Sequence, residues 1–102
     1  MNVYPKFIIE DGAIILGRVT YHKNLVVNKD LVRGGGIYNI DFENNTIMFS
    51  GESHDFGPAR LEDIKQAVNK GKVFFGYFSE DDLSKKYKCS YINQTGEITN
   101  LN

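Results

Sequence analysis

Residues 7–16 read Phe-Ile-Ile-Glu-Asp-Gly-Ala-Ile-Ile-Leu, and this stretch decides the fold class. Asp11-Gly12 between two apolar runs is typical of a two-residue type I′ turn, because both turn positions need a positive φ. Both faces of the resulting hairpin are apolar, so we predict that it lies centrally in a sheet and is covered on both sides. Such a turn predicts three cross-strand pairs: Ile9 with Ile14, Phe7 with Leu16, and Ile8 with Ile15.

A second hairpin is predicted by alternating apolar and polar residues between positions 38 and 50. With a turn at Asn44-Asn45, one face packs on the core and the other meets water or a partner. The predicted apolar face contains Tyr38 and the pairs Phe42 with Ile47 and Ile40 with Phe49.

The hydrophobic period becomes helical from Ala59 to Lys70, where Leu61, Ile64 and Val68 recur on one face. Pro58 can open this helix and Gly71 can close it. Strands are predicted beyond it at residues 72–78, through Tyr87, Cys89 and Tyr91, and at residues 97–101, with an extra strand left open at residues 25–27.

These elements together predict one α+β domain over residues 1–102. We expect a mainly antiparallel, strongly curved sheet of about six to seven strands with one helix packed on it. The expected order is β-β-β-β-α-β-β-β.

Composition excludes several function classes. Twelve Lys and Arg stand against 13 Asp and Glu, giving a net charge of −1, so no global positive field favours duplex nucleic acid. The single cysteine, Cys89, excludes an internal disulfide and is expected to be buried between Tyr87 and Tyr91. We see no signal peptide, and no apolar run approaches the roughly 20 residues of a membrane helix, so a cytoplasmic protein is expected.

The most unusual local feature is Arg33-Gly34-Gly35-Gly36. Consecutive glycine amides can form a concave nest for an anion, with Arg33 supplying charge. The alternative is a bulge or a sharp corner where two sheet layers touch. Residues 18–33 are also locally basic, which fits anion binding but equally fits an ordinary solvated loop or an edge strand protected by lysines.

Residues 53–58 form the predicted strand-to-helix loop, Ser-His-Asp-Phe-Gly-Pro. A phosphate could bind at the helix N-terminus, beside His54 or Arg60. The alternative is local capping by Ser53 or Asp55. Ser53, His54 and Asp55 do not read as a catalytic triad, because adjacent side chains point to opposite sides of an extended chain.

A resemblance is carried by residues 33–38 (Arg-Gly-Gly-Gly-Ile-Tyr), 53–58, 61–65 (Leu-Glu-Asp-Ile-Lys) and 71–74 (Gly-Lys-Val-Phe). These stretches resemble a family of small uncharacterised proteins of Bacteroides-type gut bacteria and their phages. The resemblance covers the middle half of the chain. It implies a cytoplasmic protein and transfers no functional residue.

Two functions remain open at this point. The first is a non-catalytic binding protein for an anionic small molecule, with a nucleotide or cyclic nucleotide preferred and sequestration of a signalling nucleotide as its role. The second is a protein–protein interaction or inhibitor module that acts through a sheet face or edge, with a homodimer as one form. No cofactor, metal site or catalytic residue is expected, and an enzyme is disfavoured. The predicted ligand-binding residues are Arg33, Gly34, Gly35, Gly36, Tyr38, His54 and Arg60.

Overall fold

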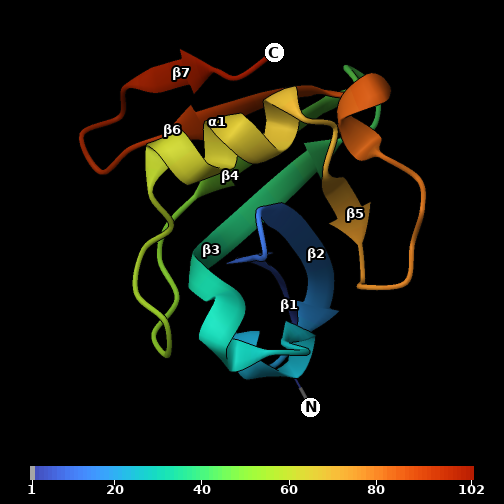
Figure 1. The fold of residues 1–102 in the computed structure, drawn as a ribbon. Helices are drawn as coiled ribbons and strands as arrows, with labels where there is room; N and C mark the ends of the chain where they lie inside the picture. Colours follow the sequence, from blue (N-terminus) through green and yellow to red (C-terminus); the bar gives the residue numbers. More distant parts are fainter. Residues whose placement is uncertain (1) are drawn as a thin grey trace.

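Seven strands form one mixed sheet that curls into a half-barrel, with a single α-helix against its inner face, as Figure 1 shows. The computed structural model describes residues 2–102. The α+β class is therefore confirmed. The strands are β1 (Tyr4–Glu10), β2 (Ala13–Val19), β3 (Val32–Asp41), β4 (Thr46–Ser50), β5 (Val73–Phe75), β6 (Lys88–Ile92) and β7 (Ile98–Asn100).

The prediction of a mainly antiparallel sheet is wrong. The spatial order is β5-β2-β1-β3-β4-β6-β7, in which β2 pairs with β5 and β4 with β6 in parallel. Parallel partners cannot be joined by a tight turn, so each of these pairs forms only after a long crossover through later parts of the chain.

The predicted order also lacked three short 3-10 helices: η1 (His22–Leu25), η2 (Lys29–Leu31) and η3 (Leu83–Lys85). The extra strand considered at residues 25–27 is wrong, because η1 ends there and the chain continues as a loop.

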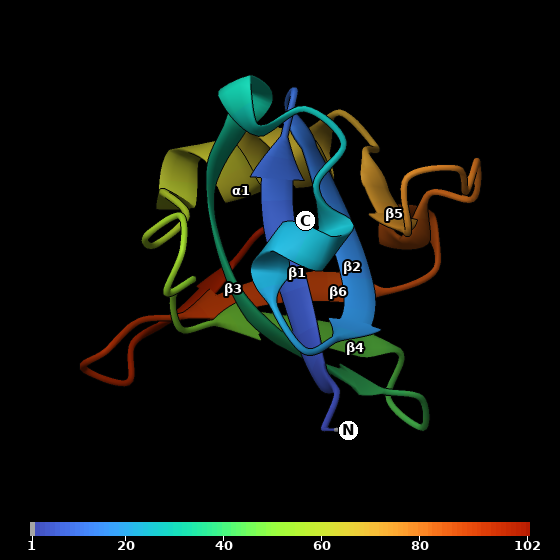
Figure 2. The same ribbon diagram turned by 90° about the horizontal axis from the view of Figure 1, so that it is seen from below.

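The first hairpin is confirmed in turn and register. Asp11 and Gly12 have φ values of 51° and 77°, as a type I′ turn requires. The side chains are buried on both faces. In Figure 2, the segment that contains η1 and η2 crosses one face of β1 and β2, and the helix α1 (Leu61–Asn69) lies on the opposite face. The three predicted pairs are all present: Ile9 with Ile14, Phe7 with Leu16, and Ile8 with Ile15.

The second hairpin forms with a different register. Ile40 pairs with Ile47 and Tyr38 with Phe49, so the loop spans four residues, 42–45, rather than two. Asp41 selects this longer loop, because its carboxylate accepts hydrogen bonds from the amides of residues 43 and 44. Phe42 is consequently in the loop and 71% exposed, not in the core.

The helix α1 lies inside the predicted range and buries Ile64, Ala67 and Val68 on the inner face of the sheet. Leu61 was expected on this buried face, but it is 38% exposed because it is the first helical residue. Phe7 and Phe49 meet edge to face at 5.1 Å in the same core, where each fully buried large apolar side chain contributes about 1.5 to 3 kcal/mol.

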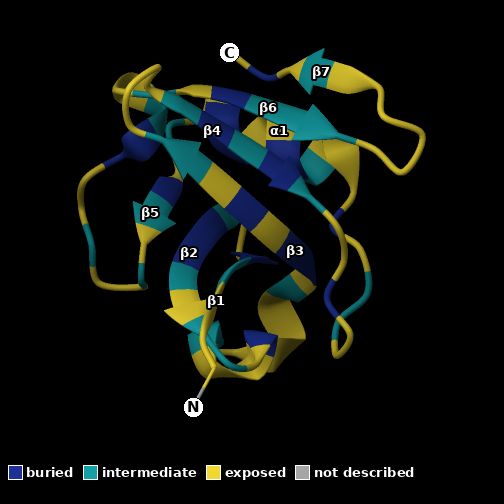
Figure 3. Ribbon diagram, turned by 180° about the vertical axis from the view of Figure 1, so that it is seen from behind, coloured by how far each residue is buried: buried dark blue, intermediate teal, exposed yellow. Residues whose placement is uncertain are grey.

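The outer face of β3, β4 and β6 has no helix over it, as Figure 3 shows from behind. Within residues 2–102, no helix combines the length and apolar character needed to cross a membrane.

Candidate functional site

The three glycines of the predicted anion nest are buried in β3, and each lies close to a neighbouring backbone segment: Gly34 to Pro58 before α1, Gly35 to Phe7 of β1, and Gly36 to Ser50 of β4. A Cβ added to Gly34 would collide with the carbonyl oxygen of Pro58. The amide of Gly35 donates to the carbonyl of Gly57 at 3.1 Å, and the carbonyl of Gly35 accepts from the amide of Ala59 at 3.2 Å. Close approach of neighbouring backbone segments at this corner therefore accounts for all three glycines, and the Gly35 amide is already used within the protein.

His22 is a structural part of the same corner. Its Nε2 lies 2.7 Å from the carbonyl oxygen of Gly36, and its ring packs on Gly35. Burial lowers the pKa of His22, with Lys6 acting in the same direction, while the bond to Gly36 and the charge of Asp55 oppose the shift. A neutral imidazole with its proton on Nε2 satisfies this geometry, because only that tautomer can donate to a carbonyl.

The strand-to-helix loop folds on itself. The Ser53 hydroxyl accepts from the amide of Phe56 at 3.0 Å, so Ser53 caps this loop and not the helix. The N-cap of α1 is Arg60, without a side-chain cap, and both Arg60 and His54 are exposed. This loop and the glycine run lie side by side, because Gly35 bridges to Pro58.

Tyr38 does not join the other predicted residues. Five strand positions separate it from Arg33, roughly 16 Å along β3. Its ring is buried on the inner face and packs edge to face on Phe75 at 6.2 Å. Burial raises the pKa of the Tyr38 phenol, and the nearby charge of Arg18 partly opposes the shift.

Tyr38 forms the floor of a cavity of about 400 Å³ at the end of the inner face. Arg18 reaches this cavity because it lies two residues beyond the buried Leu16 on the same face of β2. Phe42 and Phe75 supply exposed aromatic surface, 71% and 42% exposed. We call this the Arg18 cavity; its lining consists of Pro5, Arg18, Tyr38, Asn39, Ile40, Phe42 and Phe75.

Arg18 has no carboxylate within 4.0 Å in residues 2–102, where the one ion pair joins Lys86 to Asp81. Its positive charge therefore remains available to a ligand. Phe42 is held in place by an edge-to-face contact with Tyr87 at 6.4 Å. An unpaired guanidinium beside aromatic rings is suited to a ligand that combines an anion with a flat ring.

Arg33 lines a different cleft, of about 340 Å³, together with Lys70 and Gln66 of α1. Asp63 also lines it, and its Oδ2 is buried without a hydrogen-bond partner among the described residues. Because a carboxylate shares this cleft with the two cations, an added anion is less favoured here than beside Arg18.

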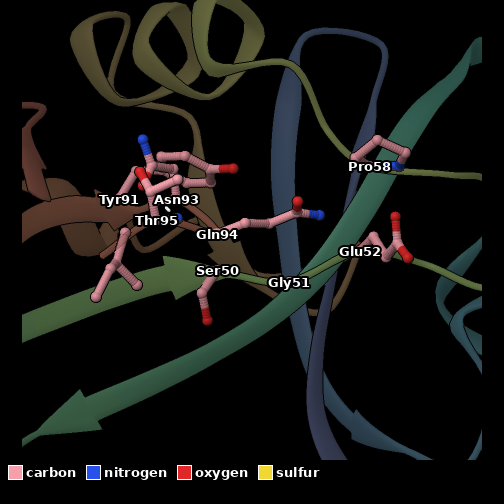
Figure 4. Close-up of a pocket in the computed structure, with 9 residues that line it drawn as sticks. Ser50, Gly51, Glu52, Pro58, Tyr91, Asn93, Gln94 and Thr95 are labelled. Atoms are coloured by element: carbon pink, nitrogen blue, oxygen red, sulfur yellow. Dashed lines mark hydrogen bonds between the residues drawn. The ribbon is translucent and has the colours of Figure 1, made fainter. Parts of the chain in front are cut away.

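A cleft of about 610 Å³, larger than the Arg18 cavity, lies where β4 and β6 end (Figure 4). Ser50 and Glu52 line one side, and Asn93, Gln94 and Thr95 line the other. Glu52 is its one charged lining residue, so this cleft does not favour anions.

Cys89 is buried, as predicted, and burial raises the pKa of its thiol to about 12. A thiolate nucleophile is therefore not available at this position near neutral pH. Residues 2–102 contain no group of three His, Cys, Asp or Glu side chains arranged to hold a metal ion.

No protein-family model, no curated protein and no solved structure matches the chain.

Sequence reasoning missed Arg18, Phe42 and Phe75 as site residues. Arg18 was noted only as one member of a basic segment, although its spacing from Leu16 placed it on the buried face of the hairpin. Phe42 was assigned to the core because the turn was predicted two residues too short. Phe75 required knowledge of the parallel pair β2–β5, which aligns Leu16 with Phe75.

Proposed function

We propose that the protein is a non-catalytic binding protein for a small anionic ligand with a flat ring, a nucleotide or cyclic nucleotide above all. The observation that carries this proposal is the unpaired Arg18 beside exposed aromatic rings in a cavity of suitable size. The phosphate-binding role thereby moves from the predicted Arg33, His54 and Arg60 to Arg18. Tyr38 remains in the proposed site, as its floor.

The aromatic side chains favour a nucleobase over a simple inorganic anion. Phe42 and Phe75 expose ring surface on which a base can stack, and such stacking contributes about 1 to 3 kcal/mol per base. Asn39 at the rim offers both a donor and an acceptor to a base edge. Binding without turnover would sequester the ligand, which suits a signalling nucleotide.

The test is a calorimetric titration of the purified protein with mono-, di- and cyclic nucleotides. Replacing Arg18 by Ala should weaken binding of a selected nucleotide at least about tenfold, because a hydrogen bond to a charged group contributes about 1.5 to 3 kcal/mol. Phe42→Ala should weaken it similarly through lost stacking. Arg60→Ala is the matched control, since Arg60 is an exposed arginine outside the cavity.

Two results would overturn this assignment. Loss of binding in Arg60→Ala or Arg33→Ala, with Arg18→Ala unaffected, would return the ligand to the glycine corner and the helix start. An absence of binding across the nucleotide panel would remove the function itself.

The alternative function, a protein-interaction module, is supported by the uncovered outer face of the sheet (Figure 3). Ile37 and Ile98 are 45% and 59% exposed on this face. In addition, β7 is an edge strand whose outer side has no partner strand within residues 2–102. Sedimentation that shows a stable dimer, abolished by Ile98→Lys, would favour this alternative.

A further inference from the structure

A second site is indicated by the cleft of about 610 Å³ at the ends of β4 and β6, which shares no lining residue with the Arg18 cavity. Because β4 and β6 are parallel, their carboxyl ends lie at the same edge of the sheet. The residues that follow each strand, 50–52 and 93–95, are thereby brought together across a gap, as Figure 4 shows.

One wall of this cleft is rigid. The side-chain oxygen of Asn93 accepts from the amides of Thr95 and Glu97 and from the Thr95 hydroxyl, at 3.0, 2.9 and 2.8 Å. The amide of Asn93 donates back to the carbonyl of Glu97 at 3.0 Å. These bonds fix the turn between β6 and β7, so a ligand would not have to order it on binding.

Three other polar side chains that line the cleft are free to bind a ligand. Gln94, Glu52 and Ser50 make no side-chain hydrogen bond within the part of the chain that the structure describes. Figure 4 shows the Gln94 side chain extended toward the segment that carries Glu52 and Pro58. A carboxamide, a carboxylate and a hydroxyl together offer donors and acceptors around one space.

The charge and the apolar surface of the cleft narrow the ligand class. No Lys, Arg or His lines it, so a phosphate or carboxylate would gain no counter-charge. Tyr91, Ile92 and Pro58 supply apolar surface beside the polar groups. The matching ligand is neutral, carries several hydroxyl groups that both donate and accept, and has an apolar C–H face.

We propose that the cleft between residues 50–52 and 93–95 is a carbohydrate-binding site for a neutral hexose or N-acetylhexosamine. The hydroxyl groups of the sugar donate to the Glu52 carboxylate and accept from the Gln94 carboxamide. The C–H face of the ring packs on Tyr91 or Pro58. This site is independent of the proposed nucleotide function.

The test is a ligand-observed NMR titration of the full chain with glucose, galactose, mannose, N-acetylglucosamine and their β-linked disaccharides. We expect selective binding of at least one sugar, weakened about tenfold or more by Gln94→Ala and by Glu52→Ala. Glu97→Ala is the matched control, since Glu97 is exposed on the same turn but does not line the cleft. Arg18→Ala should leave sugar binding unchanged, which separates this site from the nucleotide proposal.

The absence of saturable binding by every sugar of the panel would overturn the proposal. Binding that persists in Gln94→Ala and Glu52→Ala would do the same, since the sugar would then lie elsewhere. Thermal melting of each variant checks that the fold is intact. All four substituted side chains are exposed, so loss of binding with an unchanged melting temperature supports the site.

Discussion

Gly34 and Gly57 separate two reasons for a glycine in this fold. Both have a positive φ, 90° at Gly34 and 76° at Gly57, a backbone conformation that residues with a side chain rarely adopt. They differ in space, since a Cβ at Gly34 would meet the backbone of Pro58, whereas a Cβ at Gly57 would meet nothing within 4 Å. Gly34 is therefore fixed by conformation and by packing, and Gly57 by conformation alone.

This difference predicts unequal costs for the same substitution. Gly57→Ala should lower the free energy of unfolding by about 1 kcal/mol, through backbone strain. Gly34→Ala should cost about 2 kcal/mol more, because the backbone at residues 58 and 59 must also move. Urea unfolding followed by circular dichroism measures both. Equal midpoints for the two variants would show that the corner is not tightly packed.

At the scale of the element, the short edge strand β5 depends on a buried carboxylate. Asp82 accepts from the amide of Val73 at 3.3 Å and from the amide and the hydroxyl of Ser84 at 3.0 and 2.8 Å. It therefore joins the start of β5 to η3 across the loop between them. Asp81, its neighbour, instead forms an exposed ion pair with Lys86 at 3.2 Å.

We predict that Asp82→Ala lowers the free energy of unfolding by about 2 to 3 kcal/mol, because it leaves the buried amide of Val73 without an acceptor. Asp81→Ala, the matched control, should cost less than about 1 kcal/mol, since exposed ion pairs contribute little. Chemical denaturation of the two variants measures both changes in the free energy of unfolding. Similar losses in both would mean that the loop is held by something other than Asp82.

How well each element can be predicted from the sequence depends on how far apart in the chain its interacting residues lie. The first hairpin was predicted in register because Asp11-Gly12 sets its geometry locally. The second was misaligned because the choice between a two-residue and a four-residue loop depends on Asp41, whose side chain competes for the turn amides. Neither parallel pair could be predicted, since nothing near β2 specifies β5 as its neighbour.

The Arg18 cavity could not be predicted in full either, because part of its lining also depends on a parallel strand pair. Its walls come from β1, β2, β3, the loop after β3, and β5, and only the last of these depends on a parallel pairing. Tyr38 was predicted as a ligand residue from its sequence neighbourhood, whereas Phe75 enters the cavity solely through the three-dimensional order of the strands.

For the molecule as a whole, stability should depend on pH through His22. Its pKa in the folded state lies below the ordinary value of 6.5, so the folded state binds protons less readily than the unfolded chain. The free energy of unfolding should therefore decrease as the pH falls below about 6.5, and this contribution should level off below the folded-state pKa.

Urea unfolding at about pH 7.5 and about pH 5.5 tests this linkage. His22→Gln, which cannot ionise, should lose less stability between the two conditions than the parent protein. His54→Gln is the matched control, because it replaces the other histidine of the chain, whose side chain is exposed. A parent protein and His22→Gln variant with identical pH dependence would place the titrating group elsewhere.

The strand order has a consequence for the protein as it is made. The antiparallel unit β2-β1-β3-β4 is complete by residue 50, but the partners of its two outer strands, β5 and β6, begin only at residues 73 and 88. During synthesis, the four-stranded sheet can therefore form with both outer strands open until β5 and β6 have left the ribosome. Open strand edges recruit other chains, so the interval before β5 and β6 pair with the sheet is the period in which this protein is most exposed to aggregation and most dependent on chaperones.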